Sequence, residues 1–195
     1  MEKKRIAITG GIGSGKSAVL GILSRLGYAC YSCDEISRNL WQESSYQKEL
    51  LSLFPSIEKE GRPDKKLLGA LVFKDGTALK KLNTFSHPKI MRRLNELMDK
   101  DCSKLVFAEV PLFFEEGYEK EFDYVIVVLR NREARIAATM TRDGLSAEEV
   151  TKRIEAQFNY EYLNDNPKYF RLYNDGSFDK LQTNISKILE NIMKQ

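Results

Sequence analysis

The chain has 195 residues, with 31 lysines and arginines against 28 aspartates and glutamates, so its net charge is only +3. This length predicts one compact domain, or one domain that carries an insert. Hydrophobic residues make up 42% of the chain, which is enough for a sizeable core and too many for a disordered protein. The nearly balanced charge argues against a dedicated nucleic-acid-binding protein, which usually presents a strongly basic face.

The apolar runs and the cysteines bear on where the protein works. No run approaches the ~20 apolar residues of a membrane-spanning helix, and residues 6–8 are too few for the core of a secretory signal. Three cysteines cannot all pair within one chain, and Cys30, three residues before Cys33, lies on a predicted strand, where residues three apart face opposite sides. We therefore expect a cytoplasmic monomer or weak homo-oligomer without disulfides, a zinc site or membrane partners.

Strands and helices alternate along the chain. Short runs that are apolar on both faces predict five buried parallel strands, at residues 5–9, 28–32, 105–110, 124–129 and 169–173. Apolar residues at helical spacing predict helices at residues 17–26 and 178–192, and Ser177 is suited to cap the second of these. The alternation indicates a doubly wound α/β fold, in which ligands bind at the carboxyl ends of the strands.

Two longer segments interrupt this pattern. About seventy residues separate the second and third strands, and they predict helices at residues 45–54, 65–73, 77–85 and 88–101. Turn signals at residues 60–63 and 75–76 divide these helices. The second segment, residues 130–162, is helical with a break at Asp143 and Gly144, after which Ser146 and Glu149 form a capping box.

Residues 10–17 fit the spacing G-x-x-x-x-G-K-[ST] between a predicted strand and a predicted helix. The glycines let successive N–H groups point at an anion, and the following helix adds its positive end. Lys16 is then placed to reach the β- and γ-phosphates, and the Ser17 hydroxyl to ligate Mg²⁺. This phosphate loop predicts nucleoside triphosphate binding rather than a flexible glycine turn, with ligands at Gly11, Ile12, Gly13, Ser14, Gly15, Lys16 and Ser17.

Two acidic residues follow predicted strands near this loop. Asp34 comes after the second strand and is suited to accept a proton from an attacking hydroxyl or to orient it. Glu109 ends the third strand and is suited to hold Mg²⁺. The structural alternatives are that Asp34 caps a helix beginning near Glu35 and that Glu109 is a solvated strand end.

Arginines gather after the fourth strand. Residues 130–142 contain four arginines and a single acidic residue. An arginine-bearing helix that then breaks is typical of a lid that closes over a triphosphate, because arginine makes forked contacts with phosphate oxygens. We expect Arg142, next to the break, to contact ATP and to take part in catalysis, and the alternative is a solvated helix face.

The residues resemble those of dephospho-coenzyme A kinases over nearly the whole chain. The resemblance rests on the phosphate loop, on Asp34, and on Leu-Asn at 82–83, His-Pro at 87–88, Glu-Val-Pro-Leu-Phe-Phe-Glu at 109–115, Arg-Asp-Gly-Leu-Ser at 142–146 and Ala-Gln at 156–157. It implies a phosphate-loop kinase with a five-stranded parallel sheet, which uses ATP and Mg²⁺ to phosphorylate the ribose 3′-hydroxyl of dephospho-coenzyme A, giving coenzyme A and ADP.

The resemblance also implies the layout of a single kinase domain. Residues 1–38, 103–129 and 163–195 form the nucleotide-binding core, residues 39–102 the acceptor-binding helical insert, and residues 130–162 the lid. Asp34, Lys16 and Arg142 are the implied catalytic residues, and Asp34, His87 and Glu115 bind the acceptor. Ser17 and Glu109 hold the metal, and Asn174 lies in the loop that contacts adenine, where an ordinary turn is the alternative.

Some positions depart from the family pattern. Family members often carry two aspartates after the second strand, where this chain has Ser32 before Asp34, and they carry an arginine where Ala138 stands. Arg135, one turn earlier on the same helix face, is a candidate replacement for that arginine. Two other functions remain as alternatives: a phosphate-loop kinase acting on a nucleoside monophosphate or a small alcohol, and a nucleotide-dependent adaptor without catalysis.

Overall fold

The computed structural model describes residues 2–194 and divides the chain into two compact units. The first unit comprises residues 1–31 and 101–195, and the second comprises residues 32–100. The second unit thus begins at Ser32, whereas the sequence places the start of the insert at residue 39. Helix α2 (Cys33–Leu40) therefore belongs to the unit of the insert.

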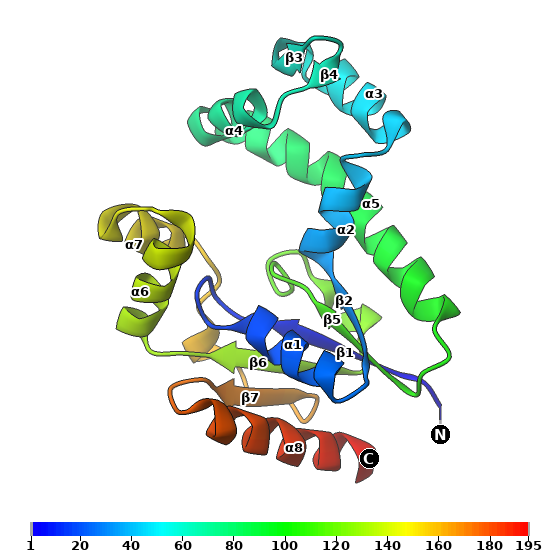
Figure 1. Cartoon of the computed structure of the whole chain (residues 1–195), viewed down its shortest axis with the longest axis vertical. Helices are drawn as coiled ribbons and strands as arrows, with labels where there is room; N and C mark the ends of the chain where they lie inside the picture. Colours follow the sequence, from blue (N-terminus) through cyan, green and yellow to red (C-terminus); the bar gives the residue numbers. More distant parts are fainter. Residues whose placement is uncertain (1, 195) are drawn as a thin grey trace. The chain divides into compact units, whose positions relative to one another are not determined.

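The first unit is built on a five-stranded sheet in the order β2-β5-β1-β6-β7 (Figure 1). Strand β1 pairs in parallel with both β5 and β6, and β6 pairs in parallel with β7. The register sets Ile8 beside Glu109, and Thr9 beside Val127. The predicted strands are confirmed as β1 (Lys4–Thr9), β2 (Ala29–Ser32), β5 (Leu105–Glu109), β6 (Tyr124–Leu129) and β7 (Tyr169–Tyr173).

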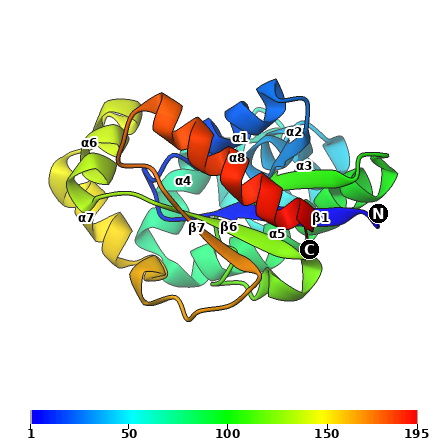
Figure 2. The same cartoon turned by 90° about the horizontal axis from the view of Figure 1, so that it is seen from below.

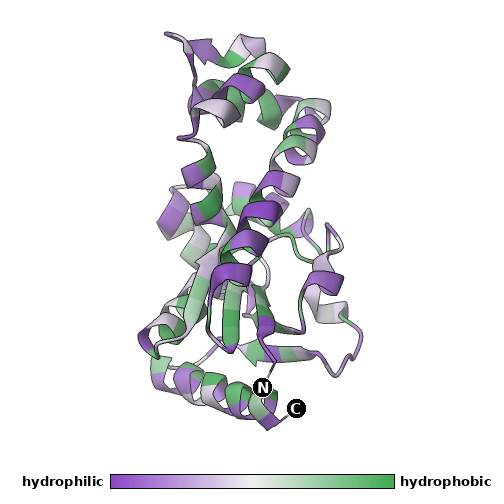
Figure 3. Cartoon of the chain, turned by 90° about the vertical axis from the view of Figure 1, so that its right-hand side faces the viewer, coloured by the Kyte–Doolittle hydropathy of each residue, from purple (hydrophilic) through white to green (hydrophobic). Residues whose placement is uncertain are grey.

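Helices α1 (Lys16–Arg25) and α8 (Phe178–Lys194) build the core of this unit together with the strands. Figure 2 shows α8 lying along the strands, and Figure 3 shows hydrophobic residues gathered in the sheet. The apolar stripe of α8 is buried because it repeats every three or four residues and so stays on one face. This stripe is formed by Leu181, Ile185, Ile188, Leu189 and Ile192.

The lid segment contains two helices, α6 (Arg132–Asp143) and α7 (Ala147–Glu155). Gly144 ends α6 in the left-handed conformation, with φ of 68°, which is a common way to end a helix. The capping box of Ser146 and Glu149 at the start of α7 is confirmed, as is the Ser177 cap of α8, whose hydroxyl accepts the Lys180 N–H. The first unit also contains the short helices η2 (Tyr118–Glu121) and η3 (Tyr160–Tyr162).

The second unit packs helices α2 and α4 (Lys65–Lys74) against the long helix α5 (Gly76–Lys100). Its buried residues include Leu50 and Leu94, and the Tyr46 hydroxyl lies 2.8 Å from the Ser86 hydroxyl. The unit also contains α3 (Ser44–Leu53), η1 (Pro55–Ile57) and an antiparallel pair of β3 (Glu58–Lys59) with β4 (Arg62–Pro63).

The predicted break between residues 85 and 88 is wrong, because α5 runs through Pro88 as one helix. Proline lacks the N–H that would bond the carbonyl four residues earlier, which here belongs to Thr84. Helices α2 and α4 pack against α5. In the turn before Pro88, the Thr84 hydroxyl also donates a hydrogen bond to the Lys80 carbonyl at 2.9 Å. Within residues 2–194, no helix combines the length and the apolar character that crossing a membrane requires.

Candidate active site

The phosphate loop connects the end of β1 to the start of α1. Gly15, at the N-cap of α1, has φ of 98°, a conformation that favours glycine, and a Cβ added to it would lie 2.2 Å from Nδ2 of Asn174. The Lys16 ammonium folds back onto the loop and donates to the carbonyls of Gly10 (2.8 Å) and Gly11 (3.2 Å). The loop thus holds its own lysine over the segment that binds phosphate in this type of motif.

Two arginines from the region after β6 lie against the same loop. The Arg130 Nη1 donates to the Gly13 carbonyl at 3.3 Å, and the Arg135 Nε donates to the Ile12 carbonyl at 2.9 Å. Arg135 also lies close to Gly11, because an added Cβ there would be 2.1 Å from its Nη2 atom. Together with Lys16, these side chains bring three positive charges to the phosphate loop, which suits a polyanionic ligand.

Two amide side chains complete the rim of the loop. The Asn174 Nδ2 donates to the Ser14 carbonyl at 2.8 Å, while the Ile12 N–H donates to Oε1 of Gln157 at 2.7 Å. Asn174 directly follows β7 and extends the pairing of β7 with β6, because its N–H donates to the Leu129 carbonyl at 2.8 Å. Segments after β6, after α7 and after β7 therefore all contact residues 12–14.

The first residues of α1 meet the end of β5. The Ser17 hydroxyl lies 3.1 Å from Oε1 of Glu109, whose residue is only 5% exposed. Glu109 is therefore not a solvated strand end, since parallel pairing of β5 with β1 carries it beside Ile8 at the base of the loop. A hydroxyl and a buried carboxylate are both oxygen ligands, which is the donor type that Mg²⁺ prefers.

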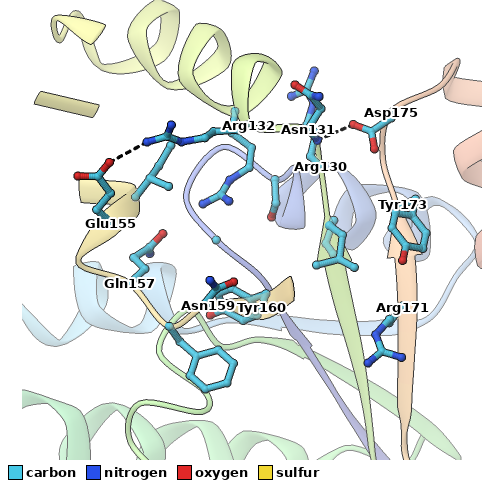
Figure 4. A pocket seen from close by; sticks show the side chains of 17 residues that line it. Arg130, Asn131, Arg132, Glu155, Gln157, Asn159, Tyr160, Arg171, Tyr173 and Asp175 are labelled. Carbon is cyan, nitrogen blue, oxygen red and sulfur yellow. Dashed lines mark hydrogen bonds and ion pairs between the residues drawn. The ribbon is translucent and has the colours of Figure 1, made fainter. Parts of the chain in front are cut away.

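A pocket of about 660 Å³ opens beside the loop (Figure 4). Two of its arginines are paired, Arg132 with Glu155 (2.8 Å) and Arg171 with Asp165 (2.7 Å). The Asn131 N–H donates to Asp175 at 2.6 Å and so joins the end of β6 to the loop after β7. The pocket wall also includes Gly11, Ser14, Arg130, Arg135, Gln157, Phe158, Asn159, Tyr160 and Tyr173.

Aromatic side chains support one wall of this pocket. The ring of Phe114 stacks on Phe158 with centroids 5.0 Å apart, and Tyr160 and Tyr169 form T-shaped pairs with Phe114. Burial raises the pKa of Tyr160 to about 12, so its phenol stays neutral and donates to the Pro111 carbonyl at 3.3 Å. The segment after α7 is thereby packed onto the loop that follows β5.

The other predicted site residues lie elsewhere. Arg142 forms a two-point pair with Asp143 (2.7 and 2.9 Å), its side chain is 62% exposed, and within residues 2–194 the pocket wall does not include it. Glu115 accepts the Phe158 N–H at 3.1 Å and so anchors the segment after α7. Catalysis by Arg142 and acceptor binding by Glu115 stay predictions.

Asp34 and His87 belong to the second unit. Asp34 lies in the first turn of α2, which begins one residue earlier at Cys33, so it does not cap a helix beginning at Glu35. His87 lies inside α5, directly before Pro88, and not at the start of a helix as the sequence indicates. Their roles also stay predictions.

Sequence reasoning gave no site role to Arg130, Gln157, Tyr160 or Tyr173, although Arg130 belongs to the arginine cluster and Gln157 to the Ala-Gln motif. A signal existed for Arg130, because it follows β6 and the carboxyl ends of neighbouring parallel strands share one sheet edge. For Gln157 and Tyr160 the contacts depend on where the segment after α7 returns to the sheet, which no local pattern specifies.

Comparison with known proteins identifies the family. A family model described as dephospho-CoA kinase matches residues 4–179. A curated dephospho-CoA kinase of Thermus thermophilus is 36% identical over 184 residues, which cover 94% of this chain and 89% of the relative. A curated dephospho-CoA kinase of Fusobacterium nucleatum is 35% identical over 158 residues, which cover 80% and 82% of the two chains.

Solved structures agree with these relatives. A crystal structure from Thermus thermophilus has a TM-score of 0.85 at 35% identity, with 98% of this chain and 99% of that one covered. The dephospho-CoA kinase from Campylobacter jejuni has a TM-score of 0.70 at 31% identity, with 98% of each chain covered. A gluconokinase from Sinorhizobium meliloti, at 11% identity and a TM-score of 0.54, shares the fold. The chain belongs to the dephospho-CoA kinase family, which catalyses the final step of coenzyme A biosynthesis.

Proposed function

We propose that this chain transfers the γ-phosphoryl group of ATP to the ribose 3′-hydroxyl of dephospho-CoA, giving coenzyme A and ADP. The observation that carries the proposal is the convergence of Lys16, Arg130 and Arg135 on one glycine-rich loop, in a chain of this family. Phosphoryl transfer needs little covalent work from the protein, and it depends on alignment and on neutralising the charge of the phosphates. Three cations at one loop supply that neutralisation.

The triphosphate lies along the loop in this proposal, with Lys16 on the β- and γ-phosphates. Arg130 and Arg135 donate to carbonyls of the phosphate loop, so their positive charges lie at that loop. We therefore assign both residues to phosphate binding. Arg142 has to leave Asp143 before it takes part. The neighbouring pocket, between the ends of β6 and β7 and the lid, is the proposed space for the nucleoside of ATP.

Ser17 and Glu109 are the proposed Mg²⁺ ligands. Their oxygen atoms lie 3.1 Å apart at the base of the phosphate loop, and the residues present fit the ion in donor type. Held by these two residues, Mg²⁺ would supply positive charge that neutralises the phosphates and the charge that develops during transfer. We expect Glu109→Gln to raise the Mg²⁺ concentration needed for half-maximal activity, since the amide removes the negative charge but keeps the shape of the side chain.

The proposed acceptor-binding residues are those that the sequence predicts, and two of them, Asp34 and His87, lie in residues 32–100. Asp34 is the proposed group that orients the 3′-hydroxyl and takes its proton, and His87 and Glu115 bind the acceptor. Asp34 is near the point where the chain passes from β2 into α2, directly after a strand of the nucleotide-binding sheet. This position in the chain, at the carboxyl end of a strand, supports its role.

One assay tests the function and separates it from its alternatives. ADP release is measured with ATP and, in turn, dephospho-CoA, AMP, a small alcohol and no acceptor. We expect rapid ADP release only when dephospho-CoA is the acceptor. Mass spectrometry then identifies coenzyme A as the product. Preference for another acceptor contradicts the proposal, and ATP binding without turnover on any acceptor indicates an adaptor. Lys16→Ala and Asp34→Ala should each lower turnover by orders of magnitude without unfolding the chain.

A further inference from the structure

Both polar groups of one residue in the phosphate loop are held by the lid region. The Ile12 N–H donates to Oε1 of Gln157 at 2.7 Å, and the Ile12 carbonyl accepts from Nε of Arg135 at 2.9 Å. Gln157 comes two residues after the end of α7, and Arg135 lies in the first half of α6. Two separate parts of the lid region thus fix the orientation of the peptide groups on either side of Ile12.

The loop needs such a restraint because it is rich in glycine. Gly10, Gly13 and Gly15 all have positive φ values, of 147°, 74° and 98°, and glycine loses more conformational freedom on ordering than any other residue. A loop that is already ordered binds its ligand more tightly, since less ordering cost remains to be met on binding. Hydrogen bonds to Ile12 supply order in the middle of the loop, between Gly10 and Gly13.

Gln157 is itself held in position from the other side. The next residue, Phe158, donates its N–H to Glu115 at 3.1 Å, and the Tyr160 hydroxyl donates to the Pro111 carbonyl at 3.3 Å. Tyr160 is only 5% exposed, so this attachment is buried. We call residues 157–160 the strap, because they join the phosphate loop to the loop that follows β5.

We propose that Gln157 is a positioning residue of the phosphate loop, which raises ATP affinity by holding the Ile12 peptide group. It acts through Ile12, and the strap keeps its amide oxygen within reach of the Ile12 N–H. The inference deepens the proposed function and rests on it for the identity of the nucleotide. Figure 4 labels Gln157, Asn159 and Tyr160 among the side chains that line the pocket.

The test uses Gln157→Met, which keeps the length of the side chain and removes the acceptor oxygen. Exchange of the Ile12 amide hydrogen is followed by NMR in the full chain without nucleotide, and the ATP dissociation constant is measured by calorimetry without an acceptor. We expect the Ile12 amide to exchange at least ~10-fold faster, in line with the net loss of one hydrogen bond, and ATP to bind ~10-fold more weakly. The amides of β1 should keep their exchange rates.

A matched variant controls for the loss of a glutamine. Gln182→Met makes the same change in α8, away from the phosphate loop, and should leave the Ile12 exchange and the ATP affinity as in the parent chain. An unchanged Ile12 exchange rate or an unchanged ATP affinity in Gln157→Met overturns the proposal. If Gln157→Met lowers the melting temperature, Gln157→Asn takes its place, because it keeps an amide that is one methylene too short to reach Ile12.

The design also separates this proposal from the proposed function. ATP binding and amide exchange are measured without dephospho-CoA, so neither depends on which acceptor the chain uses. In steady state, Gln157→Met should raise KM for ATP and leave KM for dephospho-CoA unchanged. A rise in both KM values indicates general damage to the fold and overturns a specific role in the phosphate loop.

Discussion

Two arginines of one helix face differ in what they contact. Arg135 donates to the phosphate loop, whereas Arg142, two turns later, is paired with its neighbour Asp143. The helix periodicity places both on nearly the same side of α6, but α6 meets the phosphate loop near its start and ends at Gly144 in solvent. Arg135 is therefore the better placed of the two to contact the phosphates of ATP.

We predict that Arg135→Ala lowers kcat with dephospho-CoA about 100-fold, because it removes a charged donor at the phosphates. Arg142→Ala should lower it less than ~10-fold, since that side chain is exposed and paired. Steady-state kinetics on the two variants check this order. Arg135→Lys serves as a control that keeps the charge but loses the forked geometry, and it should fall between the parent and Arg135→Ala. The reverse order would assign phosphate binding to Arg142.

The three thiols differ in burial, since Cys33 is buried, Cys30 is partly buried and Cys102 is exposed. Burial raises the pKa of the Cys30 thiol to about 11, whereas Cys102 is exposed. At pH 8, a thiol with a pKa of about 11 is ionised to roughly one part in a thousand, so very little of Cys30 is the reactive thiolate. We expect iodoacetamide to label Cys102 first and Cys30 at least ~100-fold more slowly, as measured by mass spectrometry of peptides over time.

Denaturation provides the control for this labelling. In urea the burial of Cys30 is lost, so both thiols should react at similar rates. In the folded chain, the difference between the two labelling rates should narrow as pH rises toward the Cys30 pKa, because a larger fraction of that thiol is then ionised. Equal rates in the folded chain would show that Cys30 is accessible and ionised.

Among the elements, α5 carries the clearest local conflict. Pro88 interrupts the hydrogen bonds of a 25-residue helix, which normally costs about 3 kcal/mol in a helix interior. Packing of α5 against α2 and α4 compensates this cost in the second unit. The helix therefore owes its continuity to tertiary contacts.

We predict that Pro88→Ala stabilises the chain by about 1–2 kcal/mol. Alanine restores the bond to the Thr84 carbonyl, and part of this gain is offset because alanine also gives the unfolded chain more freedom than proline. Urea unfolding followed by circular dichroism measures the change. A loss of stability would mean that α5 is bent at Pro88 in a way that its neighbours require.

The elements also show how far sequence reasoning reaches. The five strands, the phosphate loop and the caps at Ser146 and Ser177 were predictable, because each rests on local spacing and on a side chain next to its partner. The continuity of α5 was not predictable, since tertiary packing overrides the helix-breaking signal of Pro88. Sequence reasoning also could not predict the contacts of Gln157 or the difference between Arg135 and Arg142, because they depend on where the lid meets the phosphate loop.

At the scale of the whole molecule, the single tryptophan provides a fluorescence probe of one of the two units. The sole tryptophan, Trp41, belongs to the second unit, where Lys65 lies 5.1 Å above its ring. The phosphate loop and all the residues that line the neighbouring pocket belong to the first. Trp41 fluorescence therefore reports unfolding of the unit that does not contain the nucleotide pocket.

We predict that saturating ADP raises the urea midpoint measured by circular dichroism at the amide band, and the Trp41 fluorescence midpoint measured alongside it shows whether the second unit is stabilised as well. A ligand present at 100 times its dissociation constant stabilises the state that binds it by about 2.7 kcal/mol. Lys16→Ala, which weakens nucleotide binding, is the control and should abolish the shift. Equal shifts in both signals would show that the two units unfold as one.

The contact between Gly11 and Arg135 limits which sequences this fold accepts. The obstacle to a side chain at position 11 is the guanidinium end of Arg135, a flexible group that comes from a distant part of the chain. Alanine at position 11 displaces that group from Ile12, so it should cause much the same defect as Arg135→Ala, and combining the two should add little. In a laboratory evolution experiment that selects for activity, glycine should therefore persist at position 11 for as long as Arg135 is kept.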